Sequence, residues 1–142
     1  MIKVKALIIA AGQGTRIKSV GDTKPLITLL GLSLIERVIL TAKKSGIKKF
    51  CIVTGYNGEK IRKQLSDGKK YGVKIQYIQN DSWAKGNATS VLKAKNNFKK
   101  PFVLLMADHN YDSGILDRLL KTKIEKDESI LCVDNNPKKH LD

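Results

Sequence analysis

Cysteine, aromatic residues and long apolar runs are all scarce in this sequence of 142 residues, which has two cysteines and 6% aromatic side chains. Cys51 and Cys132 have neither CxxC spacing nor a histidine cluster beside them, so both are expected to be buried, reduced thiols within strands. The longest nearly uninterrupted apolar run, 26–35, has ten residues and is too short to cross a bilayer. The first predicted strand begins almost at the first residue, which leaves no room for a signal peptide and predicts a cytoplasmic location.

Acidic residues are also few, because 13 Asp and Glu stand against 27 Lys and Arg and give a net charge of +14. Such a charge could indicate nucleic-acid binding, but only four of the basic residues are arginines, and the lysines are spread along the whole chain. Arg-rich stretches interleaved with aromatic residues, which are typical of base-reading surfaces, are missing. The sequence therefore predicts no nucleic-acid partner, and its charge favours an anionic small substrate through electrostatic steering.

Apolar strand-like segments alternate with amphipathic helix-like segments along the chain. Strands are predicted over 3–10, 47–54, 73–79, 101–107 and 128–134, and helices over 33–45, 57–67, 87–98 and 113–126. Asn57 is the predicted N-cap of the second helix, and Gly68 is its predicted stop. This order predicts one α/β domain with a mostly parallel sheet, helices on both faces and right-handed crossovers. Ligands of such sheets bind beyond the carboxyl ends of the strands, so the loops there should share one edge.

A glycine-rich loop follows the first predicted strand: residues 10–16 read Ala-Ala-Gly-Gln-Gly-Thr-Arg, and Lys24 comes shortly after. Glycines there let backbone N–H groups approach an anion closely, while Arg16 and Lys24 supply positive charge for a polyphosphate. The loop lacks the third glycine of a dinucleotide fingerprint, because Ile17 occupies that position, and no ribose-binding carboxylate ends the second strand. A GxxxxGK(S/T) stretch is also missing, which excludes a P-loop.

This loop resembles the (L)xAAGxGTR…KPL signature of the sugar-phosphate nucleotidyltransferases. The matching residues are Ala10, Ala11, Gly12, Gly14, Thr15, Arg16, Lys24, Pro25 and Leu26. Segments 53–61 and 106–109 agree with the family in order and spacing, and Lys85-Gly86-Asn87 together with Asp108-His109 looks most like the CTP:inositol-1-phosphate cytidylyltransferases. Phosphocholine cytidylyltransferases of the same fold are close behind. The resemblance covers essentially the whole chain but only the amino-terminal, nucleotide-binding part of the family's domain, and it implies a Rossmann-like fold that is incomplete at the carboxyl end.

The resemblance implies transfer of a nucleoside monophosphate, CMP from CTP, to a phosphomonoester such as inositol 1-phosphate, with release of pyrophosphate. A phosphomonoester has a second pKa near ~6 and is already a dianionic nucleophile at neutral pH, so no general base is required. Arg16 is expected to clamp the β- and γ-phosphates, and Lys24, which Pro25 should hold in an extended segment, to contact the α-phosphate. Asp108, at the end of an apolar strand, is expected to hold Mg²⁺ together with the phosphates.

Other loop residues are predicted to bind substrate. Thr54, Gly55 and Tyr56 would form the floor for the nucleoside, and Lys85, Gly86 and Asn87 would lie beside the phosphate, ribose and base. Asn87 also suits the N-cap of the following helix. For His109, contact with the acceptor or the metal stands beside an ordinary hydrogen-bonding role, and for Trp83, bracing of the 79–87 loop is favoured over stacking on a base or acceptor.

Three alternatives stay open at this point. A thymidylyl-, uridylyl- or guanylyltransferase on another sugar phosphate is possible, although the 79–87 loop lacks the Gln-Pro…Gly-Leu-Ala-Gln pattern of the thymidylyl group. A non-catalytic nucleotide-binding module is the second, because the acceptor wall and a second metal-binding aspartate of the family fall outside these residues. A basic nucleic-acid binder is the third. An apolar face left by missing strands would favour a homodimer, and a carboxyl-terminal synthase partner would suit the resemblance.

Overall fold

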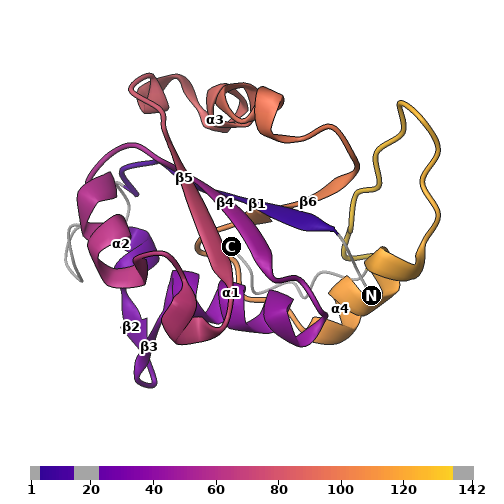
Figure 1. Ribbon diagram of the computed structural model, residues 1–142, viewed down its shortest axis with the longest axis horizontal. Coiled ribbons are helices and arrows are strands. Elements are labelled where there is room, and N and C mark those ends of the chain that lie inside the picture. The colour runs from indigo at the N-terminus through magenta and orange to yellow at the C-terminus, as the bar shows by residue number, and fades with distance from the viewer. Residues whose placement is uncertain (1–3, 15–22, 136–142) are drawn as a thin grey trace.

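The computed structural model describes residues 4–14 and 23–135, and its centre is a parallel β-sheet (Figure 1). In the described residues this sheet has the strand order β5-β4-β1-β6. Its strands are β1 (Lys5–Ala10), β4 (Lys49–Thr54), β5 (Lys74–Gln79) and β6 (Phe102–Met106). A small antiparallel pair, β2 (Thr28–Leu29) and β3 (Leu32–Ser33), precedes the first helix. Four of the five predicted strands are therefore confirmed, each within about two residues.

Helices cover both faces of the sheet, as predicted (Figure 1). The helices α1 (Leu34–Lys44), α2 (Gly58–Leu65) and α4 (Ser113–Lys121) lie on one face, and α3 (Asn87–Lys93) lies on the other. Short 3-10 turns complete the described elements: η2 (Lys24–Leu26), η3 (Lys69–Tyr71), η4 (Trp83–Lys85) and η5 (Lys95–Asn97). Among the described residues, no helix has the length and apolar character that a membrane span requires.

Two apolar layers, one on each face, hold the sheet between the helices. Ile8 and Ile52 belong to the layer under α1 and α2, whereas Leu7, Cys51 and Val53 belong to the layer under α3. Neighbouring residues of β1 point to opposite faces, and Leu7 and Ile8 both have no exposed surface. Burial on both faces explains why this strand reads as a continuous apolar run rather than as an alternating one.

Helix α1 begins at a reciprocal capping box. The Ser33 hydroxyl accepts from the Glu36 backbone N–H, and the Glu36 carboxylate accepts from the Ser33 backbone N–H at 2.8 Å. The Tyr71 hydroxyl donates to the same carboxylate at 2.7 Å. Burial raises the pKa of Glu36, but the hydrogen bonds from Tyr71 and Ser33 and the charge of Lys70 outweigh burial and leave this pKa below its ordinary value of 4.5. These contacts fix the start of α1 against the turn before β5.

The fifth predicted strand, 128–134, is absent, because its residues have no ladder partner in the described part of the chain. Cys132 is exposed in this segment, so the prediction of a buried thiol is wrong here, whereas Cys51 is buried as predicted. An apolar segment becomes a strand only where another strand accepts its hydrogen bonds, and the described part of the chain places none beside it. The preceding helix also ends earlier than predicted, at Lys121, where Thr122 adopts extended backbone.

The boundaries of α2 and α3 differ from those of the predicted helices 57–67 and 87–98. Asn57 stands at the N-cap position of α2, in left-handed backbone with φ 51°, but its side chain makes no capping hydrogen bond. The helix ends at Leu65, before the predicted stop, because Ser66 already has a positive φ of 51°. At α3 the N-cap is Gly86, with φ 100°, and the predicted cap Asn87 is the first helical residue. The predicted helix 87–98 is divided into α3 and η5 at Ala94.

Candidate active site

The order in which strands are added to the sheet reverses between β1 and β6, which are neighbours in the described sheet. From β1 the chain moves to β4 and β5 on one side, and it then returns to place β6 on the other side of β1. All the strand pairs in this sheet are parallel, so the loops that follow them lie at one edge, as predicted. Ligands of open α/β sheets bind at such a reversal of strand order, because the two following loops diverge from each other there.

A charged pair bridges this reversal. Lys24 in η2 and Asp108 after β6 form an ion pair with Nζ and Oδ2 2.6 Å apart, and their side chains are 33% and 20% exposed. The prediction that Pro25 holds Lys24 in extended backbone is wrong. Lys24 begins the 3-10 turn, which Pro25 suits by its fixed φ, and the extended residue is Thr23, with φ −134° and ψ 99°. This turn directs the ammonium group of Lys24 back toward the end of β6.

Glycines shape the wall of the first loop in two ways. Gly14 has φ 65°, and a Cβ built on it would lie 2.8 Å from the Cβ of Lys24, so a side chain here would displace the lysine. A Cβ built on Gly12 would meet nothing within 4 Å, which leaves its backbone open to an incoming group. Ala10 and Ala11 are buried, so they offer the site backbone atoms only. Thr15 and Arg16, the two other predicted residues of this loop, lie outside the described residues.

His109 follows Asp108 and is mostly exposed. The side chain of His109 is 72% exposed, and its Nε2 atom lies 3.7 Å from Oδ1 of Asp108. Lys24 pairs with the other oxygen of this carboxylate, Oδ2. The backbone N–H of His109 donates to the carbonyl of Met106 at 3.4 Å, which fixes the turn after β6. The exposed imidazole is therefore accessible to a ligand at this edge of the sheet.

The donor set around Asp108 fits a magnesium ion shared with phosphates. No group of three or more His, Cys, Asp or Glu side chains gathers anywhere in residues 4–14 and 23–135. Mg²⁺ does not need such a cage, because it commonly takes one or two carboxylates together with substrate phosphates and water. Asp108 offers one hard carboxylate, partly exposed, beside the glycine-rich loop. This arrangement matches a cation that arrives with a nucleotide rather than one held by protein ligands alone.

The segment 54–56 ties the loop after β4 to the glycine-rich loop. The backbone N–H of Tyr56 donates to the carbonyl of Ala11 at 3.0 Å. Thr54 is fully buried, and its hydroxyl accepts from the Arg62 guanidinium at 3.0 Å. A Cβ on Gly55 would lie 2.7 Å from Trp83 and 2.8 Å from the Ala11 carbonyl, so only glycine allows this close packing. Gly55 and Tyr56 thus form a continuous surface with the first loop, and Thr54 supports it from below.

Trp83 braces the loop after β5. Its ring meets the Tyr56 ring edge-on, with centroids 5.5 Å apart, and its side chain also covers Gly55. This packing is the bracing role that the sequence favoured. Lys85, Gly86 and Asn87 follow directly and are exposed beyond this brace. The structure therefore brings the described predicted residues to one edge, with Lys85–Asn87 at its far end.

Sequence reasoning missed Asn80, which anchors the same loop. Asn80 is fully buried, and its amide group donates to Ser90 at 2.9 Å and to Thr89 at 3.0 Å. Its side-chain oxygen accepts from the Ser82 backbone N–H at 3.0 Å, which closes an Asx-turn. An asparagine directly after an apolar strand, with serine two residues later, is a sequence signal that could have identified this anchor.

The chain was compared with known proteins. A family model described as nucleotidyl transferase matches residues 5–140. A protein of Rubrobacter xylanophilus named bifunctional IPC transferase and DIPP synthase is 32% identical over 94% of this chain and 30% of its own length. A Methanococcus maripaludis protein named bifunctional protein GlmU is 33% identical over 92% of this chain and 30% of its own length. The chain thus spans about a third of the curated relatives that it matches.

A solved structure supports the same fold. The inositol-1-phosphate CTP transferase from T. maritima superposes with a TM-score of 0.68 and 27% identity, over 87% of this chain and 49% of that one. The Rossmann-like nucleotidyltransferase fold that the sequence resemblance implied is therefore confirmed for the part of the domain that this chain spans. With the glycine-rich loop, the parallel sheet and the family match in agreement, the chain belongs to the nucleotidyl transferase family.

Proposed function

We propose that this chain is the nucleotide-binding part of a nucleotidyltransferase domain that transfers CMP from CTP to a phosphomonoester such as inositol 1-phosphate. One observation carries the proposal: the Lys24–Asp108 pair lies at the reversal of strand order between β1 and β6, with Lys24 against Gly14 of the glycine-rich loop. A cation and a carboxylate at this point are the groups that a nucleotide–metal complex requires. The names of the Rubrobacter relative and the T. maritima structure support this choice of nucleotide and acceptor.

The reaction is an in-line displacement at the α-phosphorus of the nucleotide. An oxygen of the acceptor phosphate forms the new bond to phosphorus, and the bond to the bridging oxygen breaks, so pyrophosphate leaves with that electron pair. The acceptor is already a dianion near neutral pH, so no side chain has to remove a proton. The work of the protein is to align the two phosphates and to balance the charge that develops on the leaving group.

Each proposed residue has one task in this scheme. Lys24 binds the α-phosphate and the bridging oxygen, and the backbone of the glycine-rich loop donates to the remaining phosphate oxygens. Arg16, outside the described residues, is the proposed clamp for the β- and γ-phosphates. Asp108 would hold Mg²⁺, which neutralises phosphate charge when bound.

The ion pair itself suggests how the site exchanges partners. In the structure the Lys24 ammonium and the Asp108 carboxylate neutralise each other at 2.6 Å. A nucleotide bound with a cation offers a phosphate to the lysine and a positive charge to the carboxylate, so neither group is left unpaired when the two separate. Gly55, Tyr56 and the 85–87 segment would then hold the nucleoside, with the buried Thr54 supporting them from below, and His109 would contact the acceptor.

A substrate panel tests the proposed base and acceptor. Pyrophosphate release is measured with CTP, UTP, dTTP, GTP or ATP, each with inositol 1-phosphate, phosphocholine, glucose 1-phosphate or N-acetylglucosamine 1-phosphate. Release with CTP and inositol 1-phosphate above all other pairs is expected. A preference for another nucleotide would replace the cytidylyl assignment by one of its alternatives within the family, for which the GlmU relative is a reason to include the amino sugar.

A second assay separates catalysis from passive binding. If the chain binds CTP by isothermal titration but releases no pyrophosphate with any acceptor, it is a nucleotide-binding module and the catalytic part of the proposal fails. RNA affinity that persists at physiological salt while CTP does not bind would instead support a nucleic-acid binder.

Two variants examine the charged pair. Lys24→Met is expected to lower the rate of pyrophosphate release by roughly 30- to 1,000-fold, the usual loss when one group that stabilises the transition state is removed. Asp108→Asn is expected to abolish the dependence of CTP binding on added Mg²⁺. The matched controls, Lys121→Met and Asp117→Asn on exposed positions of α4, should change neither quantity. Equal effects of the controls and the site variants would contradict the assignment.

A further inference from the structure

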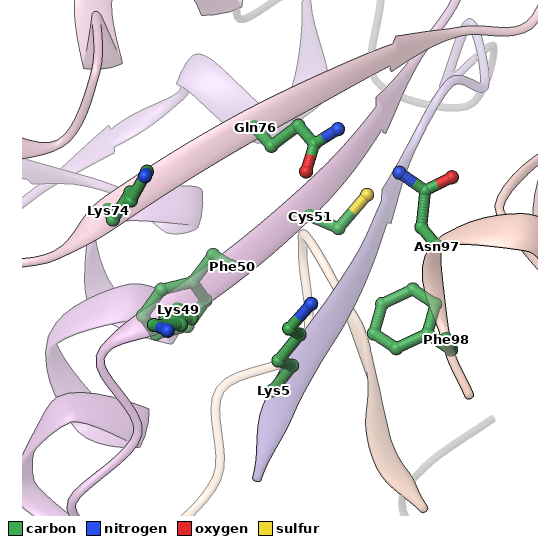
Figure 2. Close-up of a pocket in the computed structure, with 8 residues that line it drawn as sticks. All are labelled: Lys5, Lys49, Phe50, Cys51, Lys74, Gln76, Asn97 and Phe98. Atoms are coloured by element: carbon green, nitrogen blue, oxygen red, sulfur yellow. The ribbon is translucent and has the colours of Figure 1, made fainter. Parts of the chain in front are cut away.

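A pocket lies at the edge of the sheet opposite the candidate active site, where the strands begin (Figure 2). It has a volume of about 160 Å³ and is lined by Lys5, Lys49, Cys51, Lys74, Gln76 and Asn97 together with the aromatic residues Phe50 and Phe98. Strand β1 runs from Lys5 at this edge to Ala10 at the other, and a strand rises about 3.3 Å per residue, so roughly 16 Å separate the pocket from the active-site edge. The proposed catalysis uses none of these residues.

Strand register places the three lysines side by side in one row. Lys49 pairs with Lys74, and the pairing of Ala6 with Phe50 sets Lys5 beside Lys49. Their side chains leave the same face of the sheet, since residues paired in register share a face. Neighbouring strands lie about 4.8 Å apart, so three ammonium groups start from backbone positions that span only about 10 Å.

Electrostatic repulsion among these three lysines is not offset by any negative charge paired with them in the described part of the chain. Like charges directly opposite each other on neighbouring strands destabilise a sheet. No carboxylate among the described residues forms an ion pair with Lys5, Lys49 or Lys74, whereas Lys24 at the other edge is paired with Asp108. A row of cations held together without a counter-charge is the arrangement expected of an anion-binding surface.

The walls of the pocket supply hydrogen-bond donors without adding negative charge. Lys5, Gln76 and Asn97 extend toward the space above the Cys51 thiol (Figure 2). Each carboxamide has an NH₂ group that can donate to an oxyanion. Burial, opposed by the charge of Lys5, raises the pKa of Cys51 to about 11, so the thiol at the base stays neutral at physiological pH. Cations and amide donors therefore stand beside a neutral thiol, and the other lining residues, Phe50 and Phe98, add no charge.

We propose that this pocket binds a small oxyanion of the phosphate class. Its volume corresponds to about five water molecules at ~30 Å³ each, which leaves room for inorganic phosphate or pyrophosphate. A larger phosphorylated molecule would place its phosphate among the lysines and its remainder in solvent, because the three lysines are exposed. The site does not depend on the proposed catalysis, although pyrophosphate is the product of that reaction.

The test follows individual backbone amides by NMR while phosphate, pyrophosphate or glycerol phosphate is added to the chain at constant ionic strength. We expect saturable shifts at Lys5, Lys49, Cys51 and Gln76 that are independent of shifts at the glycine-rich loop. Comparison of the three titrations shows whether the free ions or the phosphate of a larger molecule bind more tightly. Shifts confined to the active-site edge would overturn the proposal while leaving the proposed function intact.

A charge-matched pair of triple variants provides the control. K5Q/K49Q/K74Q should weaken binding at this pocket at least tenfold, whereas K63Q/K93Q/K121Q, which removes the same charge from exposed helix positions, should weaken it less than twofold. Without added anion, the first variant should unfold at an equal or higher urea concentration than the wild type, because the repulsion within the row is gone. Equal weakening by both variants would show that net charge alone attracts the anion, and the pocket would not be a site.

Discussion

Strands β1 and β6 are neighbours with similarly apolar sequences, yet they differ in how much of them is covered. In β1, Leu7 and Ile8 have no exposed surface, while in β6 Leu104 is 49% exposed and Phe102 is 38% exposed. β1 lies between two strands, with apolar layers on both faces, whereas β6 has no described strand on its outer side. An apolar run therefore predicts that a strand forms, but its neighbours decide how deeply it is buried.

In the part of the chain that the structure describes, the segment 128–134 has even fewer strand neighbours than β6. Four of its seven residues are apolar, but it has no strand partner among the described residues, and Leu131 and Val133 are 82% and 67% exposed. Exposed apolar residues on an unpaired edge favour association with another chain or segment. The β6 edge and this segment are thus where we expect the chain to be least stable and most ready to associate.

The largest difference between β1 and β6 should appear in the free energy of unfolding when one side chain in each strand is truncated. Ile8→Ala removes a fully buried side chain from the apolar layer under α1 and α2. This change should lower the free energy of unfolding by about 3–4 kcal/mol. Leu104→Ala removes a half-exposed side chain and should cost less than about 1 kcal/mol. Urea unfolding followed by circular dichroism measures both values. Equal losses would mean that β6 is covered in solution.

The two thiols should differ next most strongly, in their rates of reaction. Burial raises the pKa of Cys51 to about 11, so at pH 8 only about 0.1% is thiolate, and the sulfur is also covered. Cys132 is exposed in the unpaired segment. Labelling with a coloured disulfide reagent should therefore modify Cys132 at least about 100-fold faster than Cys51, with C51S and C132S identifying each phase. Comparable rates would show that the sheet opens readily at β4.

A moderate loss of stability should follow when a hydrogen bond at the start of α1 is removed. Helix α4 has no capping box of this kind. Tyr71→Phe removes a hydrogen bond to an ionised carboxylate and should cost about 1–2 kcal/mol near pH 7. Because the pKa of Glu36 is lowered in the folded state, this stabilisation is present above pH 4.5 and is lost as the pH falls through the folded pKa. The difference between wild type and Y71F should be constant above pH 4.5 and should shrink as the pH falls further below that value. A difference that stays constant at low pH as well would assign the cost to packing alone.

The smallest effect on stability, within about 0.5 kcal/mol, is expected for Leu104→Glu, yet this variant decides whether the β6 face associates. The homodimer that the sequence suggested would use this face. Sedimentation velocity should then show dimers of the wild type that L104E dissociates, while Leu92→Glu, on the exposed side of α3, leaves them intact. A wild-type chain that is monomeric at all concentrations would make the homodimer prediction wrong.

Much of this architecture could be predicted because its causes are local. The apolar runs that became β1, β4, β5 and β6 are each followed within two residues by a glycine, asparagine or aspartate, and the loop at 10–16 carries its phosphate-binding character in its own residues. Alternation of these segments was enough to place their loops at one edge. The family resemblance then rested on those loops.

The remainder depended on contacts between distant segments, which the sequence does not display. Nothing local shows that Gly55 must admit Trp83, that Glu36 meets Tyr71, or that 128–134 has no strand beside it. The lysine row is a consequence of register, since Lys5, Lys49 and Lys74 are far apart in the chain and adjacent only in the sheet. Register between parallel strands follows from packing of the whole domain.

The ion pair between Lys24 and Asp108 has a thermodynamic consequence. A phosphate that approaches alone must take the lysine from its carboxylate, and a cation that approaches alone must take the carboxylate from its lysine. Under the proposed function, each ligand releases the group that the other needs, so their binding is positively linked. The linkage is reciprocal: magnesium should tighten the nucleotide by the same factor by which the nucleotide tightens magnesium. Such a site holds the metal–nucleotide complex in preference to either component.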